Sequence, residues 1–422
     1  MDGTLAVTGA TLDGEAVGLR AEDGRIAALG PDVTAREGDE VIDAPGMALV
    51  PGLWNAHTHA AMTLFRGYGD DMPLMEWLQR KIWPVEERLD ADDVYWGTRL
   101  ACAEMIRTGT VGFWDMYWQP GATARAVADA GIRAVIGAPL IDGGDPGSDH
   151  KLDELKQFTE QSLAEVADAG ERISAAIAPH AIYTVSEPSL RWIGERAEKA
   201  ELPIHIHLSE TEQEVDDCVT AHGARPAAYL DRLGVLGPRT LLAHGVWLDD
   251  AELDLIAERG TTVVTNPVAN LKLAVGGVFP YPAANARRID VGLGTDGAGS
   301  NNSLDMFEQM KFFALIQKHA AGDPTVAPAG QVWEIATGAR SSLVGASGRL
   351  AVGAPADFVL VSGTAPELTH GDLTAALVYA ASGSVVDTTV VDGRVLMRGG
   401  EIEGIDEIRE RAVERARRLG IT

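Results

Sequence analysis

Two histidines, His57 and His59, are the residues of this chain with the clearest capacity for chemistry. They follow a short apolar run, 47–50, which Pro51-Gly52 closes, so the pattern predicts a strand and its end. Side chains two residues apart on an extended chain point to the same side. The two imidazoles can therefore bind one metal ion, and imidazole is a common ligand of zinc and iron. Two buried structural histidines are the alternative, so the hypothesis depends on partners elsewhere in the chain.

Further polar residues stand at or just after the ends of other apolar runs. These residues are His180, His207, Glu210, His244 and Asp296. Catalytic groups of a parallel barrel lie at the carboxyl ends of its strands, where the loops begin. A purely structural role in the core easily explains one such residue, but it explains five of them poorly. The pattern therefore favours an active site over five unrelated core residues.

The segment 49–348 alternates short apolar runs with amphipathic stretches. The predicted strands are 47–50, 110–115, 133–140, 173–178, 203–208, 240–243, 261–265 and 290–294. The predicted helices between them include 91–108, 121–130, 186–200 and 249–259. Strand and helix repeated eight times is typical of a closed parallel barrel. We therefore expect an α/β fold with a (β/α)8 TIM-type barrel.

The two ends of the chain have a different pattern. Residues 1–48 and 349–400 consist of short alternating strands with turn signals such as Asp23-Gly24 and Asp392-Gly393. We expect these two segments to join into one small β-sandwich domain beside the barrel. Residues 401–422 follow as a C-terminal helix, and the alternating charges at 404–420 predict a solvated one.

The composition limits the classes of partner. The net charge is −27, with 62 acidic against 35 basic residues, and the acids are scattered along the chain. Such a surface argues against binding of nucleic acid or anionic membranes. It is typical of proteins from salt-loving organisms, although an ordinary acidic protein would also fit. Because we find no long apolar run, no signal-peptide pattern and only two cysteines, we expect a cytoplasmic protein without a membrane span.

Five motifs in order along the chain resemble those of the amidohydrolase superfamily. They are Pro-Gly-Leu-Trp-Asn-Ala-His57-Thr-His59, Ile-His207-Leu-Ser-Glu210, Ala-His244-Gly, Asn266-Pro-Val-Ala-Asn-Leu-Lys-Leu and Gly-Thr-Asp296-Gly-Ala-Gly-Ser-Asn-Asn-Ser. Within the superfamily they are most similar to the deaminases of 5′-methylthioadenosine and S-adenosylhomocysteine. The resemblance covers residues 45 to 310 and is more specific for the family than for the substrate.

The resemblance implies a set of metal ligands. They are His57, His59, His207 and Asp296. One divalent ion is expected, zinc in the first place with iron(II) as an alternative, because the fourth strand ends at His180 without the lysine that accompanies two metals. Three histidines and one carboxylate leave a coordination position for water, whose pKa the ion would lower.

The resemblance also implies catalytic roles. Glu210 would donate a proton to the ring nitrogen next to the attacked carbon. Asp296 would take the proton of the attacking water and pass it to the leaving amine. His244 would hold the hydroxide by a hydrogen bond. The alternatives are a surface acid in a loop for Glu210 and a structural strand-end residue for His244.

The residues that would contact the substrate are assigned mainly from the resemblance. By resemblance Glu86 would bind the ribose hydroxyls, since a carboxylate can accept from both. Trp83 would form a wall against the base, and His180 would contact the nucleoside. The alternatives are an exposed helix acid for Glu86, apolar packing for Trp83 and a structural histidine for His180.

Three departures from the family bear on the substrate. Thr265 stands where many relatives carry histidine, and Ala138-Pro139 stands near the place of an arginine. His150 or Lys151 could supply a positive group in the following loop. The loss of these positive groups weakens the case for a carboxylated tail, hence for S-adenosylhomocysteine.

We therefore predict a zinc-dependent deaminase of an adenine nucleoside, which includes adenosine, 5′-deoxyadenosine, methylthioadenosine and S-adenosylhomocysteine. An aminohydrolase or chlorohydrolase acting on guanine, a pterin or a triazine is the first alternative. A metal-binding barrel without catalysis is the second. Whether the chain forms a homo-oligomer stays open.

Overall fold

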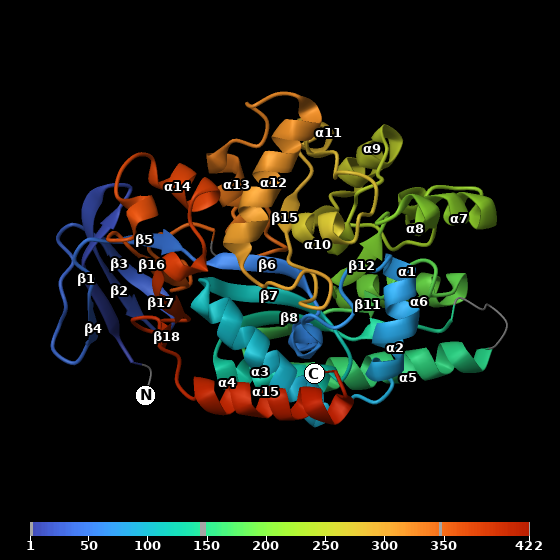
Figure 1. Ribbon diagram of the computed structural model, residues 1–422, viewed down its shortest axis with the longest axis horizontal. Coiled ribbons are helices and arrows are strands. Elements are labelled where there is room, and N and C mark those ends of the chain that lie inside the picture. Colours follow the sequence, from blue (N-terminus) through green and yellow to red (C-terminus); the bar gives the residue numbers. More distant parts are fainter. Residues whose placement is uncertain (1–2, 144–148, 346–347, 422) are drawn as a thin grey trace.

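The computed structural model describes residues 3–143, 149–345 and 348–421. In Figure 1 a β-sheet occupies one end of the molecule, and a larger body of strands and helices occupies the rest. No helix in the described part of the chain is both long and apolar enough to cross a membrane.

The sheet at one end joins strands from both termini. Its order is β18 (Arg394–Met397), β17 (Val386–Val391), β16 (Phe358–Ser362), β5 (Met47–Pro51), β1 (Leu5–Leu12), β2 (Glu15–Glu22) and β3 (Arg25–Gly30), with β4 (Glu40–Asp43) also paired to β1. The antiparallel pairing of β16 with β5 connects the two ends of the chain. Buried side chains from these strands, among them Leu19, Leu49 and Phe358, form a separate hydrophobic cluster.

The sequence analysis assigned 47–50 to the barrel, and this assignment is wrong. These residues lie in β5, so the small sheet extends to Pro51 rather than to residue 48. The first barrel strand is the next one, β6 (Leu53–Thr58), and it carries His57. Gly52 lets the chain pass between the two strands, because a side chain there would collide with Val111. The segment 47–58 thus contains two strands, β5 and β6, with Gly52 between them.

The barrel is built from parallel strands in chain order. They are β6, β7 (Thr110–Met116), β8 with β9 (Arg133–Gly137, Pro139–Leu140), β10 with β11 (Ile173–Ala175, Ala178–Pro179), β12 (Ile204–Leu208), β13 (Thr240–His244), β14 (Thr262–Thr265) and β15 (Val291–Leu293). A parallel bridge between Ile177 and Ile204 joins the two halves. The N–H of Asp296 donates to the carbonyl of His57 at 3.0 Å and connects the last strand to the first. The predicted barrel fold is confirmed.

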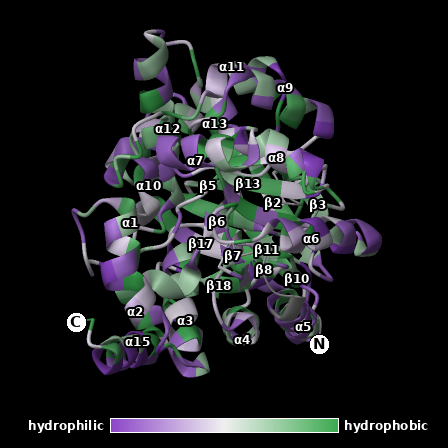
Figure 2. Cartoon of the chain, turned by 90° about the vertical axis from the view of Figure 1, so that its right-hand side faces the viewer, coloured by the Kyte–Doolittle hydropathy of each residue, from purple (hydrophilic) through white to green (hydrophobic). Residues whose placement is uncertain are grey.

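Helices surround these strands, as Figure 2 shows from the end of the molecule opposite the terminal sheet. They are α3 (Ala91–Arg107), α4 (Pro120–Ala130), α5 (Asp149–Ala167), α6 (Glu187–Ala200), α7 (Glu212–His222), α8 (Pro226–Arg232), α9 (Asp250–Arg259), α10 (Pro267–Lys272), α11 (Tyr281–Ala286), α12 (Met306–Ala321), α13 (Ala329–Ala336) and α14 (Leu373–Tyr379). Capping boxes begin α3 at Asp90 and α9 at Asp249, so the sequence itself fixes these starts.

A helical insertion follows β6 and leads to α3. It contains η1 (Ala60–Phe65), α1 (Leu74–Trp77), the π-helical segment η2 (Leu78–Ile82) and α2 (Trp83–Glu86). The last three elements are continuous in the chain. π-helical segments are rare and frequently lie at functional sites.

The predicted C-terminal helix is present as α15 (Ile405–Leu419), but one of its faces is buried instead of solvated. It lies along α3 (Figure 1). Ile408, Ala412, Ala416 and Leu419 are buried and recur at helical spacing, so they form one apolar stripe against the protein. The alternating charges of the sequence occupy the remaining faces and conceal this stripe.

Candidate metal centre and substrate pocket

The ends of four barrel strands bring histidine nitrogens and one carboxylate together. Nε2 of His59 lies 3.2 Å from Oδ1 of Asp296, and Nε2 of His57 lies 3.5 Å from the same oxygen. Nε2 of His207 lies 3.3 Å from Nε2 of His59. Ligand atoms of His57, His244 and Asp296 form a second close group. We call these five residues the histidine–aspartate cluster.

The other ring nitrogen of each histidine has a hydrogen-bond partner. Nδ1 of His59 lies 2.6 Å from the carbonyl of Met116, and Nδ1 of His207 lies 2.8 Å from the carbonyl of His180. A carbonyl only accepts, so each Nδ1 carries the proton. In neutral rings, both Nε2 atoms then offer a lone pair to the cluster.

The remaining two histidines are held by side chains. Nδ1 of His244 lies 2.8 Å from Oδ1 of Asn270, which also places its proton on Nδ1. Nδ1 of His57 lies 2.8 Å from Nε2 of His205, a fifth histidine that is fully buried. Sequence reasoning gave His205 no role, although its place two residues before His207 puts it on the same side of β12.

This arrangement fits a divalent cation. Nε2 of His57 is buried and has no hydrogen-bond partner among the described residues. Nε2 atoms that offer lone pairs and the Asp296 carboxylate surround the same space. Lone pairs at such distances repel one another unless a proton or a cation lies between them. Nitrogen and carboxylate donors together are typical of zinc and related transition metals.

The pKa values of His57, His207 and Asp296 agree with this interpretation, whereas that of His59 differs. Burial lowers the pKa of His57 to about 3, and burial holds that of His207 well below its ordinary value. Burial also acts on His59, but its hydrogen bond to Asp296 and the charge of Asp296 raise its pKa to about 9. Burial opposes ionisation of Asp296, yet its close contacts with the His57 and His59 rings hold its pKa well below the usual range. Asp296 thus stays ionised as a ligand must.

Two members of the cluster have strained backbones. His244 has a φ of +76° and Asp296 a φ of +63°. Left-handed conformations are uncommon outside glycine and cluster at functional sites. Here they turn each side chain into the barrel mouth directly after the strand ends.

Glu210 lies beside the cluster and is nearly buried. Its carboxylate lies 3.7 Å from Nδ1 of His244. Its backbone N–H and that of Ser209 donate to the two carboxylate oxygens of Glu214, at 2.8 and 2.9 Å. Burial raises the pKa of Glu210, so this carboxyl holds its proton more strongly than an exposed one.

A cavity of about 600 Å³ opens onto the cluster, a volume typical of small-molecule sites. The predicted residues that line it are His59, Trp83, Glu86, His180, His207, Glu210, His244 and Asp296. His57, the remaining predicted residue, does not line the cavity and is fully buried. The geometry therefore brings all predicted site residues to one place.

Glu86 belongs to the wall formed by the helical insertion. The hydroxyl of Tyr117 donates to Oε1 of Glu86 at 2.8 Å. Burial raises the pKa of Glu86, and its hydrogen bonds to Tyr117 and Trp118 lower it by less. Both aromatic residues line the cavity, whereas the sequence leaves open whether their segment, 114–118, lies at a subunit contact or under the active site. Their place directly after β7 was the one available signal.

His180 also lines the cavity, and its Nδ1 lies 2.9 Å from Oγ1 of Thr184. Of the two candidate positive groups, the amino group of Lys151 lies beside Gly143, which lines the cavity. The side chain of His150 lies outside the described residues.

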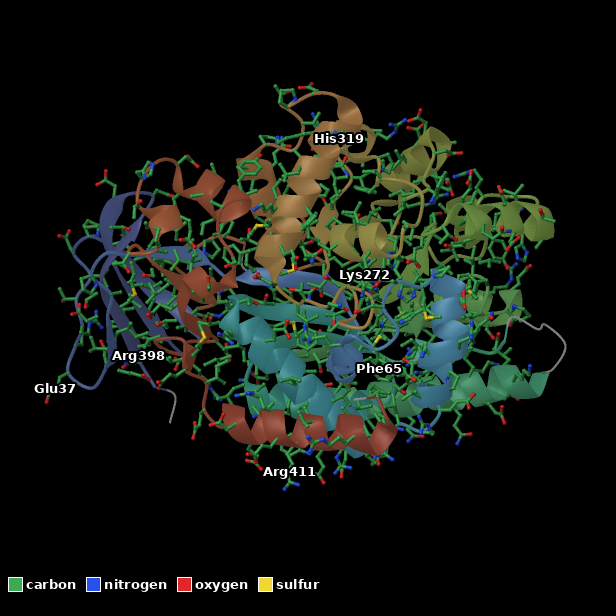
Figure 3. The ribbon with its side chains drawn as sticks, viewed as in Figure 1. Glu37, Phe65, Lys272, His319, Arg398 and Arg411 are labelled. Carbon is green, nitrogen blue, oxygen red and sulfur yellow. The ribbon has the colours of Figure 1, made fainter. Side chains whose placement is uncertain are left out.

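The insertion is fastened to the rest of the barrel mouth. Lys272, at the end of α10 (Figure 3), donates to Oδ1 of Asp70 at 2.6 Å and to Oδ1 of Asn302 at 2.8 Å. Asp70 precedes α1, and Asn302 lies in the loop after Asp296. The ammonium group of Lys272 thus connects the helical insertion to the loop that follows Asp296.

Comparison with known proteins agrees with this geometry. The amidohydrolase family matches residues 48–396. A 5′-deoxyadenosine deaminase of Methanoregula boonei is 49% identical over 400 residues, which cover 93% of this chain and 90% of that protein. A 5-methylthioadenosine/S-adenosylhomocysteine deaminase of Archaeoglobus fulgidus is 45% identical over 95% of this chain and 94% of its own length.

Among solved structures, an adenosine deaminase from Xanthomonas campestris with bound zinc superimposes with a TM-score of 0.91. Its sequence is 35% identical, and the match covers 100% of this chain and 99% of that one. The family match, the extent of the sequence identity and the shared fold lead to one conclusion: the chain belongs to the amidohydrolase family.

Proposed function

We propose that this protein is a zinc-dependent deaminase of an adenine nucleoside, which releases ammonia and the inosine analogue. One observation carries the proposal: the histidine–aspartate cluster and Glu210 meet at one cavity that has a carboxylate, Glu86, in its wall. The similar proteins support the substrate class, because they are named as deaminases of 5′-deoxyadenosine, methylthioadenosine, S-adenosylhomocysteine and adenosine.

The residues that would hold the ion are His57, His59, His207 and Asp296. A divalent ion lowers the pKa of water toward about 7 and so supplies hydroxide at neutral pH. His244 lies within the same group of ligand atoms, so it is placed either to bind the ion as well or to orient the hydroxide.

Two carboxyl groups would move the protons. Glu210 gives its proton to the ring nitrogen adjacent to the carbon that the hydroxide attacks, which neutralises the charge that builds up there. Asp296 accepts the proton of the attacking water and delivers it to the exocyclic amine, which leaves as ammonia. As the carbonyl forms, the hydroxyl proton of the adduct is released and restores the proton of Glu210. The raised pKa of Glu210 helps this group to hold the proton that it donates, and the lowered pKa of Asp296 keeps that group ionised and so able to accept one.

The wall of the cavity would hold the nucleoside. Glu86 would accept hydrogen bonds from the two ribose hydroxyls, and Tyr117 keeps its carboxylate in place. Trp83 and His180 line the cavity and would enclose the base and sugar. A diol-binding carboxylate in the wall favours a nucleoside over a bare base or a triazine, neither of which has a ribose.

Ammonia release from a panel of substrates tests this proposal. The panel contains adenosine, 5′-deoxyadenosine, methylthioadenosine, S-adenosylhomocysteine, guanine, a pterin and a chlorinated triazine, at low and high salt. We expect turnover of the nucleosides, with loss of the adenine absorbance. Activity on guanine, the pterin or the triazine alone would overturn the substrate class and retain the metal chemistry. Inactivity on the whole panel by protein loaded with zinc would overturn the proposal.

A further inference from the structure

His205, which lies behind the histidine–aspartate cluster, has no part in the proton transfers described above. It is fully buried, two residues before His207 on β12, and therefore deeper in the barrel. Its Nε2 lies 2.8 Å from Nδ1 of His57, within hydrogen-bond distance. Its ring packs edge to face against Trp114, with centroids 5.6 Å apart.

The short contact between two imidazoles requires one proton between them. Nε2 of His57 faces the cluster, so in a ring that binds a cation the proton must reside on Nδ1. His57 then donates to Nε2 of His205, which must be an acceptor. His205 in turn carries its own proton on Nδ1, an atom without a hydrogen-bond partner among the described residues.

His57 differs in this respect from its neighbours. His59 and His207 donate to backbone carbonyls, and His244 lies against the amide oxygen of Asn270. A carbonyl can only accept, so it fixes the tautomer of its partner. An imidazole can accept or donate, so the tautomers of His57 and His205 are coupled. A buried, unused imidazole would be costly in an apolar barrel interior, because its polar atoms lose their contacts with water.

We propose that His205 is a positioning residue, which holds His57 in the Nδ1-protonated tautomer and in its orientation and thereby strengthens cation binding. The inference rests on the metal site of the proposed function, but not on the substrate. Partners of this kind commonly contribute 10- to 100-fold to metal affinity. The alternative is a histidine that only fills space beside Trp114.

Three variants separate the two roles. His205→Leu fills most of the space and removes the acceptor. His205→Gln is long enough to place an amide oxygen near the former Nε2, so it restores the acceptor. Ile206→Val, a change at the next and equally buried residue of β12, controls for disturbance of the strand. His205→Asn introduces a polar side chain that is too short to reach His57, and it replaces His205→Leu if that variant does not fold.

The measurement is the affinity of metal-free protein for zinc, by competition with a chromophoric chelator, with melting temperatures of the metal-free variants as a check of folding. We expect about 10- to 100-fold weaker binding for His205→Leu or His205→Asn. We expect His205→Gln and Ile206→Val to remain within a few-fold of the unchanged protein. In the cobalt-substituted protein, the visible spectrum should change in the Leu variant and be retained in the Gln variant.

Equal zinc affinity in the unchanged protein and the folded Leu or Asn variant would overturn the inference. Equal weakening by Gln and Leu would also overturn it, because the acceptor would then not matter. If the unchanged protein binds zinc but deaminates no nucleoside, while the affinities follow the expected order, the proposed substrate fails and the role of His205 stands. If the unchanged protein deaminates nucleosides but all variants bind zinc with equal affinity, the proposed function stands and the role of His205 fails.

Discussion

The two ends of the substrate cavity are built in different ways. At the metal end, each ligand stands at or just after a barrel strand, and His59 and His207 are oriented by backbone carbonyls of neighbouring strands. At the nucleoside end, Glu86 stands on a helical insertion that two long-range attachments hold. Lys272 binds Asp70 before α1, and the C-terminal helix binds the segment that follows α2.

The second attachment joins residues far apart in the chain. Arg88 donates to the carbonyl of Leu419 at 2.9 Å, and Arg418 donates to the carbonyl of Arg88 at 3.1 Å and pairs with the buried Asp93. At the metal end, two histidines are therefore held by strand backbone, whereas the wall depends on contacts that the side chains of Lys272, Arg88 and Arg418 make. Changes at the two ends should affect different kinetic constants.

Removal of the metal should have the largest effect. A strong chelator should abolish turnover, and zinc should restore it, because the hydroxide nucleophile depends on the ion. The melting temperature should fall as well, since an ion at 100 times its dissociation constant stabilises the folded state by about 2.7 kcal/mol. Metal analysis together with ammonia release checks this. Full turnover in protein shown to be free of metal would contradict the metal end as described.

Glu210→Gln should have the next largest effect. We expect kcat to fall by about 10²- to 10⁴-fold, because a positioned proton donor contributes that much, while zinc content stays unchanged. Steady-state kinetics and metal analysis measure the two quantities. Glu212→Gln, an exposed acid two residues on, is the matched control. A rate equal to that of the control would remove Glu210 from the proton transfer.

Glu86→Gln should act on binding rather than on chemistry. A hydrogen bond to a charged group contributes about 1.5–3 kcal/mol, so kcat/KM should fall by about 10- to 100-fold, mainly through KM. The loss should nearly vanish with 2′,3′-dideoxyadenosine, which lacks both hydroxyls. Glu76→Gln lies on the same insertion and serves as a control. An equal loss with the dideoxy substrate would show that Glu86 does not bind the diol.

Arg418→Ala should have the smallest effect. It leaves the buried carboxylate of Asp93 with one partner fewer, at a cost of about 1 kcal/mol because Arg418 itself is exposed. We expect a slightly lower melting temperature and a few-fold higher KM, with kcat and zinc content unchanged. Arg417→Ala, at an exposed neighbour on the same helix, should change neither. A change in kcat instead of KM would mean that the wall and the metal end are coupled.

Much of the barrel could be predicted from local patterns. Seven of the eight predicted barrel strands overlap barrel strands of the structure. A short apolar run between amphipathic stretches is typical of a buried strand between surface helices. The grouping of His57, His59, His207, His244 and Asp296 followed from the same logic, since the carboxyl ends of parallel strands meet at one face. The resemblance to a known family supplied the roles of these residues.

Other features depended on contacts that no local pattern encodes. The run 47–50 has the composition of a barrel strand, but its pairing with β16 places it in the other sheet. The burial of one face of α15 depends on its packing against α3. The many charged residues of α15 make the whole helix look solvated when only the sequence is considered.

The sequence by itself determined which side chains could bind a metal, because the side-chain direction along a strand is a local property of the backbone. Only the tertiary structure decided how each is held. The carbonyl behind His59, the imidazole behind His57 and the hydroxyl behind Glu86 come from other elements of the chain. Hydrogen bonds between distant segments depend on the packing of whole elements, which the spacing of residues along one chain does not specify.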